Sequence, residues 1–337
     1  MKLMRSLTST LALVAMIAAT GCTPVSVSFT FGAHGDRLRE RVVIAERPTS
    51  RDKIALIDIR GLITELPRPG LLGSRPSPVD ELVARLERAE KDSRVRAIVL
   101  RINSPGGTVT GSDLMYGEIR RFAERTGKPV VASLGEVAAS GGYYAALAAD
   151  RIVAQPTSLT GSIGVIFPTI NVSEGLARIG IHARAITSGP NKDMGDPLSP
   201  PVEEHYRILQ SIVDEHYARF RSLVRKRRPD LDPDHVQQAT DGRVLTGTQA
   251  LGWGLVDAVG SLRDAYELAR TLAGAERARL VKYASGSARP RSPYAASAPA
   301  PVSTGPPSLN LSLVNLDMGS WAWASSSAWY LWLPPSP

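Results

Sequence analysis

Residues 138–144 read Ala-Ala-Ser-Gly-Gly-Tyr-Tyr, and they place Ser140 where a predicted strand turns into a predicted helix. Small neighbours at such a turn leave a serine hydroxyl uncovered, so that it can act as a nucleophile. The amide of Gly141 would then point near the oxygen of the attacked carbonyl group. The alternative is a serine that only caps the helix, which is a common role. The residues around Ser140 leave both interpretations open.

A second turn with paired glycines follows another apolar strand. Residues 103–107 read Asn-Ser-Pro-Gly-Gly. Paired glycines let the backbone turn sharply and expose N–H groups, and an amide there can stabilise a developing oxyanion. An ordinary strand-to-helix turn has the same composition, so this motif alone does not establish a site.

A serine nucleophile needs a base, and histidine is the first candidate. The five histidines are not in a recognisable triad context, and none has metal-ligand spacing, so we expect no zinc site. They are His34, His182, His205, His216 and His235.

Lysine is the other candidate base. Lys192 lies in the loop 188–195, which reads Ser-Gly-Pro-Asn-Lys-Asp-Met-Gly. A lysine can serve as a base only if burial lowers the pKa of its amine toward neutrality. Asp193 and Asp196 would oppose that change if they faced the amine. The alternative is a solvent-exposed loop lysine with no chemical role.

Apolar runs alternate with amphipathic stretches from residue 53 to residue 272. Predicted strands cover 53–59, 96–102, 129–133, 151–154 and 163–166. Predicted helices cover 82–91, 114–126, 141–149 and 201–228, and two short helical pieces lie within 250–272. This alternation predicts an α/β fold with a largely parallel sheet. The carboxyl ends of its strands would hold both glycine turns.

The N-terminal segment has the pattern of an export signal, which we assign to residues 1–21. Two cations precede an apolar run that is too short to span a bilayer comfortably. Cys22 is the single cysteine, so the chain has no internal disulfide. The sequence Ala-Thr-Gly-Cys resembles a lipobox, which predicts lipidation of Cys22. The alternative is an ordinary cleaved signal with an incidental thiol. Residues 22–50 are predicted to be an anchor and an extended segment with a strand over 25–31.

The composition changes again near residue 286. We assign residues 51–285 to one core domain and residues 286–337 to a linker rich in Pro, Ser and Ala and a Trp-rich tail. The aromatic residues of the tail are Trp321, Trp323, Trp329, Tyr330 and Trp332. Tryptophan and tyrosine favour membrane and protein interfaces alike. The tail is therefore expected either to dock on a subunit or membrane, or to be a disordered or processed end.

The chain is basic, with a formal net charge of +8. The densest cationic cluster lies within 219–228, at the end of a predicted helix, where cations are favourable. It can be a solvated helix end or a contact with an anionic membrane surface. We find no motif for RNA or DNA binding and expect no nucleic-acid partner.

Six segments, in this order, carry a resemblance to a known family. They are 104–107 (Ser-Pro-Gly-Gly), 138–150, 160–165 (Thr-Gly-Ser-Ile-Gly-Val), 189–193 (Gly-Pro-Asn-Lys-Asp), 241–247 and 255–260. Together they resemble signal peptide peptidase A, the SppA-type serine peptidases, in the short form with a single copy of the core. The resemblance covers about residues 53–275.

The resemblance implies a crotonase-like (ClpP-like) fold with repeated β-β-α units. It implies Ser140 as nucleophile, Lys192 as general base and the amides of Gly107 and Gly141 as oxyanion donors. Ser162 is a candidate for orienting the lysine. No metal or organic cofactor is implied. Because one site of the family combines serine and lysine from different core copies, the resemblance also implies a ring-like homo-oligomer with shared active sites.

The expected protein is thus an exported, membrane-anchored lipoprotein that faces the periplasm or the cell exterior. It would cut signal peptides or other apolar, flexible peptides. One alternative is a crotonase-fold enzyme acting on acyl thioesters, although an export signal argues against cytoplasmic acyl-CoA. Another is a non-catalytic membrane scaffold, although the serine and lysine argue against it.

Overall fold

The computed structural model describes residues 38–45, 50–70, 73–285, 290–295 and 328–332. Several predictions fall outside these residues: the signal over 1–21, Cys22, the strand over 25–31 and the tryptophans at 321 and 323. Described helices and strands begin and end as follows: β1 Arg39–Ala45, β2 Lys53–Arg60, β3 Arg68–Gly70, β4 Gly73–Arg75, α2 Pro78–Glu90, β5 Val95–Ser104, β6 Gly106–Thr108, α3 Val109–Thr126, β7 Val130–Ala139, α4 Gly141–Ala146, β8 Arg151–Ala154, β9 Leu159–Gly161, α5 Ser173–Arg178, α6 Glu203–Arg227, α7 Val236–Ala239, β10 Val244–Thr246, α8 Gly247–Gly252, β11 Ala258–Val259, α9 Leu262–Leu272, β12 Arg279–Ala284 and β13 Trp329–Leu331.

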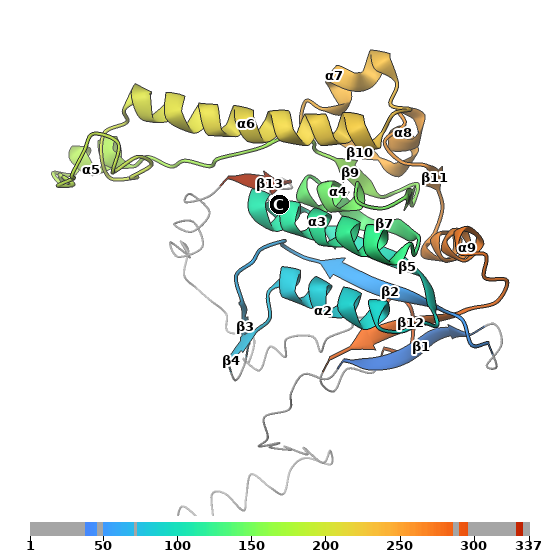
Figure 1. Cartoon of the computed structure of the whole chain (residues 1–337). Helices are drawn as coiled ribbons and strands as arrows, with labels where there is room; N and C mark the ends of the chain where they lie inside the picture. The colour runs from blue at the N-terminus through green and yellow to red at the C-terminus, as the bar shows by residue number, and fades with distance from the viewer. Residues whose placement is uncertain (1–37, 46–49, 71–72, 286–289, 296–327, 333–337) are drawn as a thin grey trace, which may run out of the picture. The chain divides into compact units, whose positions relative to one another are not determined.

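Alternate residues of the central strands face two hydrophobic layers, as the two-residue period of a strand requires. On β2, Ala55 and Ile57 pack toward the layer that contains α2, α3 and α4. Ile54 and Leu56 face the opposite layer, which contains α9. Figure 1 shows α2 and α3 on one side of the sheet and α9 on the other. These strands are apolar on both faces because helices cover both faces.

The main sheet among the described residues has nine strands, with the order β1-β12-β2-β5-β7-β8-β11, and β9 and β10 branch from β7. Pairings from β12 to β11 and between β7 and β9 are parallel. Only β1 with β12, and β9 with β10, are antiparallel in this sheet. The predicted largely parallel sheet is confirmed. It includes β1, which precedes residue 51.

One predicted strand is wrong. Residues 163–166 form no strand, and Ile166 makes a single antiparallel bridge to Trp329. The apolar run that suggested a strand arises because Ile163 is buried in the core. A second apolar position in the run, Ile166, instead pairs with the distant segment β13.

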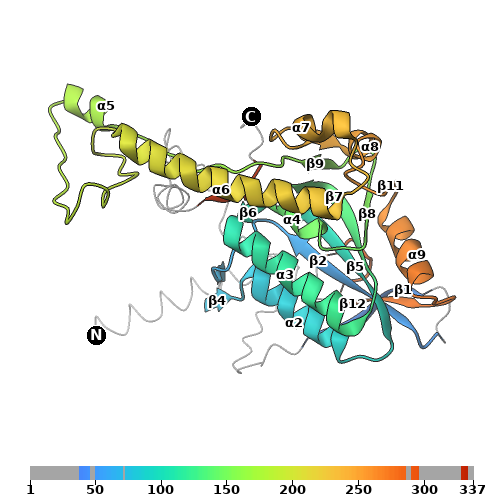
Figure 2. The same ribbon diagram turned by 45° about the horizontal axis from the view of Figure 1, so that its top comes forward.

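The two ends of the long helix α6 have different surroundings. Its second half packs on the core through buried Phe220 and Val224. Arg227 ties that end to the carbonyls of Leu147 and Ala149, at 2.8 Å each. At its N-terminal end, α5 and the loop that leads to α6 project beyond the sheet in both views (Figures 1 and 2). We call residues 167–202 the arm. No helix of the described residues is both long and apolar enough to cross a membrane.

Candidate active site

Ser140 ends β7 and begins α4 in a strained conformation. Its φ is 52° and its ψ is −116°, outside the regions that L-residues ordinarily adopt. Such a residue costs about 1–3 kcal/mol and persists only where its surroundings enforce it. The Ser140 amide donates to the carbonyl of Gly161 at 2.8 Å, which fixes the turn.

The side chain of Ser140 makes no hydrogen bond to cap α4. The residue is only 1% exposed, and its Oγ has no hydrogen-bond partner among the described residues. A buried hydroxyl without a partner is unfavourable. Ser140 thus occupies the N-cap position of α4, but its side chain does not cap the helix and its hydroxyl is left unbonded.

Three glycines stand beside this turn where no side chain would fit. A Cβ on Gly107 would lie 1.9 Å from the carbonyl oxygen of Ile63. A Cβ on Gly141 would lie 2.3 Å from Ser112 Oγ and 3.1 Å from the Gly107 nitrogen. A Cβ on Gly106 would lie 2.8 Å from the Gly141 nitrogen. The structure thus brings the backbones of Gly107 and Gly141 together at the start of α4.

Ser104 braces the glycine turn. It is fully buried, and its hydroxyl donates to the carbonyl of Gly61 at 2.7 Å and accepts from the amide of Gly106 at 3.1 Å. Sequence reasoning noted the Ser-Pro-Gly-Gly motif but gave this serine no role. The signal was its place two residues before the paired glycines, where a side-chain acceptor can replace a ladder bond.

Ser162 lies next to the same turn. The parallel register of β7 and β9 pairs Ala138 with Thr160 and Ala139 with Gly161, and Ser140 and Ser162 are the next residues after these two strands. Ser162 also has a positive φ of 50° and is largely buried. Its amide donates to the carbonyl of Arg243 at 2.7 Å.

A third chain segment completes the surroundings of this turn, and sequence reasoning missed it. Strand β13 pairs antiparallel with β6, with Tyr330 opposite Gly107. The Trp-rich tail was expected either to dock on a subunit or membrane or to be a disordered or processed end, but its described part pairs with β6 and with Ile166 of this chain. A pairing between residues so far apart leaves no local periodicity in the sequence.

Lys192 lies elsewhere, in the arm. It is exposed, and its amide donates to the carbonyl of Gly189 at 3.2 Å. In Figures 1 and 2 the arm lies at the N-terminal end of α6, whereas α4 lies under the second half of that helix. A single chain therefore does not bring Lys192 to Ser140.

The loop around Lys192 is held by its own hydrogen bonds. Asp196 accepts from the Ser199 hydroxyl at 2.5 Å and from the Leu198 amide at 3.1 Å. The bond from Ser199 lowers the pKa of the Asp196 carboxyl. His205 at the start of α6 bonds the carbonyl of Pro190 at 2.8 Å. The carboxylate of Asp196 is thus engaged within its loop.

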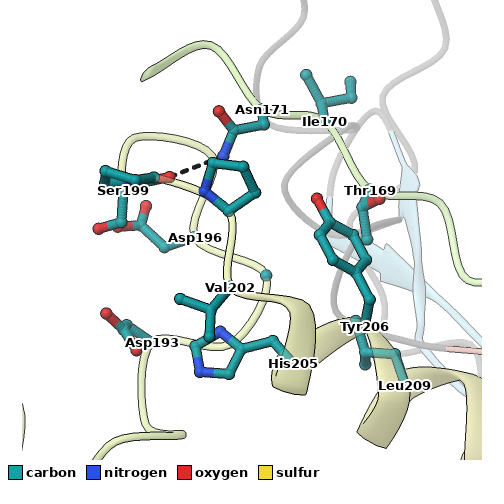
Figure 3. A pocket seen from close by; sticks show the side chains of 13 residues that line it. Thr169, Ile170, Asn171, Asp193, Asp196, Ser199, Val202, His205, Tyr206 and Leu209 are labelled. Atoms are coloured by element: carbon teal, nitrogen blue, oxygen red, sulfur yellow. Dashed lines mark hydrogen bonds between the residues drawn. The ribbon is translucent and has the colours of Figure 1, made fainter. Parts of the chain in front are cut away.

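Figure 3 shows a small pocket in the arm, beside the start of α6. Asp193, Asp196, His205 and Tyr206 are among its lining residues, and its volume is about 30 Å³. The Asn171 side-chain amide donates to the carbonyl of Ser199 across it at 2.7 Å. The space suits a water molecule or two and is too small for a peptide side chain.

A buried lysine elsewhere is not a rival base. Lys282 on β12 is fully buried, and burial lowers the pKa of its amine. Its Nζ lies 2.7 Å from a carboxylate oxygen of Asp58 and donates to the carbonyls of Pro293 and Ala295. Strands β2 and β5 separate β12 from β7 in the sheet. Lys282 is therefore a structural ion-pair residue that holds residues 293–295.

Two histidines of the described part of the chain are engaged by neighbouring groups. His205 bonds Pro190, and His235 pairs with Asp232 at 2.7 Å while stacking on Trp253. The described residues contain no group of His, Cys, Asp and Glu that could hold a metal ion.

Fold and site together define a class of protein: α/β enzymes that present a serine at the carboxyl end of a parallel strand, next to backbone amides. Comparisons with known proteins narrow this class. The sequence model of peptidase family S49 matches residues 123–276. "Putative protease slr0021" of Synechocystis is 36% identical over 228 residues, which are 68% of this chain and 77% of that protein.

"Protease 4" of Salmonella typhi is 40% identical over 224 residues, 65% of this chain. That alignment covers only 34% of Protease 4, so the chain spans about a third of that relative. Among solved structures, the chain resembles "1510-N membrane-bound stomatin-specific protease S97A mutant" at 18% identity and a TM-score of 0.40, covering 65% of this chain and 84% of that one.

The chain belongs to peptidase family S49, the SppA-type peptidases, and it is a serine peptidase. The predicted family is confirmed, as is the predicted α/β fold with a largely parallel sheet. Family membership favours a peptidase over the acyl-thioester enzyme and the non-catalytic scaffold that the sequence had left open.

Proposed function

We propose that this peptidase hydrolyses peptide bonds with Ser140 as nucleophile and Lys192 of a neighbouring copy as general base. One observation carries the proposal. Ser140 is held in a strained conformation with a buried, unbonded hydroxyl, and the next residue, Gly141, lies against the backbone of Gly107. Strain and an unsatisfied polar group are both unfavourable for stability, and they are typical of functional sites.

The reaction follows from these groups. The neutral amine of Lys192 takes the proton from Ser140 Oγ, and Oγ bonds to the substrate carbonyl carbon. The amides of Gly107 and Gly141 donate to the oxygen that becomes negative. The lysine ammonium then protonates the leaving amine as the C–N bond breaks. Water, deprotonated by the same amine, releases the acyl group from Ser140.

The arm supports a site shared between copies. Lys192 is exposed in the arm, which lies at the N-terminal end of α6, whereas α4 lies under the second half of that helix. Large apolar side chains of the arm are exposed as well, and Ile186 is 99% and Ile179 71% exposed. Apolar surface of this kind marks an interaction site. Packing the arm against a second copy would cover it, and an amine removed from water is more easily neutral. The proposed assembly is therefore a homo-oligomer.

Ser162 is proposed to position the lysine. Ser140 and Ser162 each directly follow the paired strands β7 and β9, which supports a Ser162 hydroxyl close to an amine that approaches Ser140. A hydrogen bond there would orient the amine without touching the substrate. We assign it a positioning role and not a part in bond breaking.

The proposed substrates are extended, apolar peptides, including signal peptides. Beside the site, β6 and Ile166 hold the extended segment β13 through backbone hydrogen bonds. Recognition by added strand pairing suits flexible chains of varied sequence. An export signal over 1–21 and lipidation of Cys22 would hold the enzyme at a membrane, where apolar peptides are released.

Covalent labelling tests the nucleophile. A fluorophosphonate reacts with an activated serine, so mass spectrometry of the digested protein is expected to find the added group on the peptide that contains Ser140. Ser140→Ala should abolish labelling and peptide hydrolysis, whereas Ser211→Ala, an exposed serine on α6, should change neither. Labelling at another serine, or hydrolysis retained by purified Ser140→Ala, would refute the assignment.

A further inference from the structure

The strained residue Ser162 is held by the turn of residues 241–243. The Ser162 amide donates to the carbonyl of Arg243 at 2.7 Å. Strands β9 and β10 meet at this point and pair antiparallel, with Gly161 opposite Val244. A Cβ on Gly161 would lie 3.1 Å from the Arg243 carbonyl oxygen. The position of the Ser162 backbone therefore depends on where the turn holds that carbonyl group.

An ion pair closes the turn. Asp241 Oδ1 accepts from the backbone amide of Arg243 at 3.0 Å, and the two carboxylate oxygens accept from Nε and Nη2 of Arg243 at 2.9 and 2.6 Å. A forked pair of this kind fixes the orientation of its two partners as well as their distance. Gly242 between them has a φ of 92°, a conformation that suits glycine. A Cβ on Gly164 would lie 3.4 Å from the Gly242 Cα, so the chain just after Ser162 packs on the same turn.

Aromatic rings support the Arg243 side chain from a second side. Its guanidinium lies over the ring of Trp253, 5.8 Å from the centroid. Trp253 in turn stacks on His235, with centroids 4.6 Å apart. The side chains of Arg243 and Asp241 are nevertheless 43% and 39% exposed, and exposed ion pairs contribute little to folding stability. The main effect of this arrangement is therefore geometric, and it acts on the carbonyl that holds Ser162.

We propose that Asp241 and Arg243 are positioning residues, whose ion pair holds the Arg243 carbonyl and, through it, keeps Ser162 where its hydroxyl orients the amine of Lys192. This inference rests on the proposed function and extends it to two residues that act only through Ser162. A small displacement of an orienting group slows the chemical step, whereas the affinity for the peptide should stay the same. The alternative is an ion pair that only closes a surface turn.

Hydrogen exchange of the Ser162 amide tests this link without requiring catalysis. Arg243→Ala removes the ion pair, so the bond from Ser162 to the carbonyl should open more often. NMR is expected to show about tenfold faster exchange of this amide than in the control Arg121→Ala, which removes another surface ion pair, with Glu118 on α3. Equal exchange in the two chains would overturn the inference, whether or not the proposed nucleophile and base are correct.

Steady-state kinetics test the positioning role. Arg243→Ala should lower kcat for a peptide substrate about tenfold and leave KM nearly unchanged, while Arg121→Ala keeps the wild-type kcat. If Arg243→Ala does not fold, Arg243→Lys replaces it, because lysine keeps the charge and loses the fork. A wild-type kcat in the folded Arg243 variant would overturn the inference.

A double-mutant cycle with Ser162→Ala identifies the route of the effect. If the ion pair acts through Ser162, adding Arg243→Ala to Ser162→Ala should lower kcat less than about twofold further, whereas independent effects would multiply. A further tenfold loss, or a wild-type kcat in Ser162→Ala alone, would overturn the inference. Hydrolysis by Ser140→Ala reports separately on the proposed function, because that variant leaves the turn of residues 241–243 intact.

Discussion

The turn at Ser140 and the arm differ in burial and in packing, although the proposed mechanism takes one reacting group from each. Ser140 lies in a closely packed turn where glycine backbones, Ser104 and Ser162 leave little freedom. Lys192 is exposed in a loop. Hydrogen bonds of this loop join residues of the arm to one another and to the start of α6. The turn is complete within one chain, while the arm presents apolar surface outward. The difference indicates that activity depends on assembly.

Among the variants in the arm, Lys192→Ala is expected to reduce peptidase activity most. If its amine is the base, kcat/KM for a peptide substrate falls by about 10⁴-fold or more. The variant should still fold, because the side chain is exposed in the single chain. Lys226→Ala is the control and should keep full activity, because Lys226 is an exposed lysine that lies on α6, outside the arm. Comparable activity in both variants would remove the arm from the mechanism.

Gly107→Ala tests the turn. The new Cβ would meet the Ile63 carbonyl at 1.9 Å, so the strand must shift and the amide must move. Loss of one oxyanion donor typically lowers kcat by about 10²–10³-fold. Gly117→Ala on α3 has open space around the added Cβ and should leave kcat unchanged. Steady-state kinetics of the two folded variants measure this difference in kcat. A wild-type kcat in Gly107→Ala would refute the proposed role of the Gly107 amide.

The double variant Ile179→Ser/Ile186→Ser probes the apolar arm. It removes two exposed side chains that we expect an adjoining copy to cover. At low protein concentration, activity should fall about tenfold as the assembly dissociates, and analytical ultracentrifugation should show smaller species. Leu272→Ser, an exposed apolar residue at the end of α9, should change neither result. An unchanged oligomer with full activity would show that these residues are not at the interface.

Ser199→Ala is expected to have the smallest effect, a change in the pKa of Asp196 within the arm. The bond from Ser199 lowers the pKa of the Asp196 carboxyl below its ordinary value of 3.8. A lowered folded-state pKa stabilises the folded loop above pH 3.8, and this stabilisation is lost as the pH falls through the folded-state value. Removing the hydroxyl should raise the pKa of Asp196, as measured by carbon NMR titration. Ser173→Ala, which removes a hydroxyl bonded to Asn171, should leave that pKa unchanged.

The sequence predicted those features of the fold that are local. Alternation of apolar runs and amphipathic stretches predicted the parallel sheet, and small residues around Ser140 predicted a strand-to-helix turn. The pairing of Tyr330 with Gly107 was not predictable, because no periodicity links such distant residues. The strained φ of Ser140 and its unbonded hydroxyl were also hidden, since they depend on neighbours brought in by β6 and β9. The role of Lys192 stays a prediction.

The most direct test of the shared site is to mix two inactive proteins. Ser140→Ala subunits carry an intact Lys192, and Lys192→Ala subunits carry an intact Ser140. If each site takes one residue from each of two neighbours, random mixing of equal amounts completes about a quarter of the sites in a ring with head-to-tail interfaces. We predict that the mixture regains about a quarter of wild-type peptide hydrolysis, while each variant alone stays inactive. A mixture that forms mixed oligomers by native mass spectrometry and yet stays inactive would contradict the account.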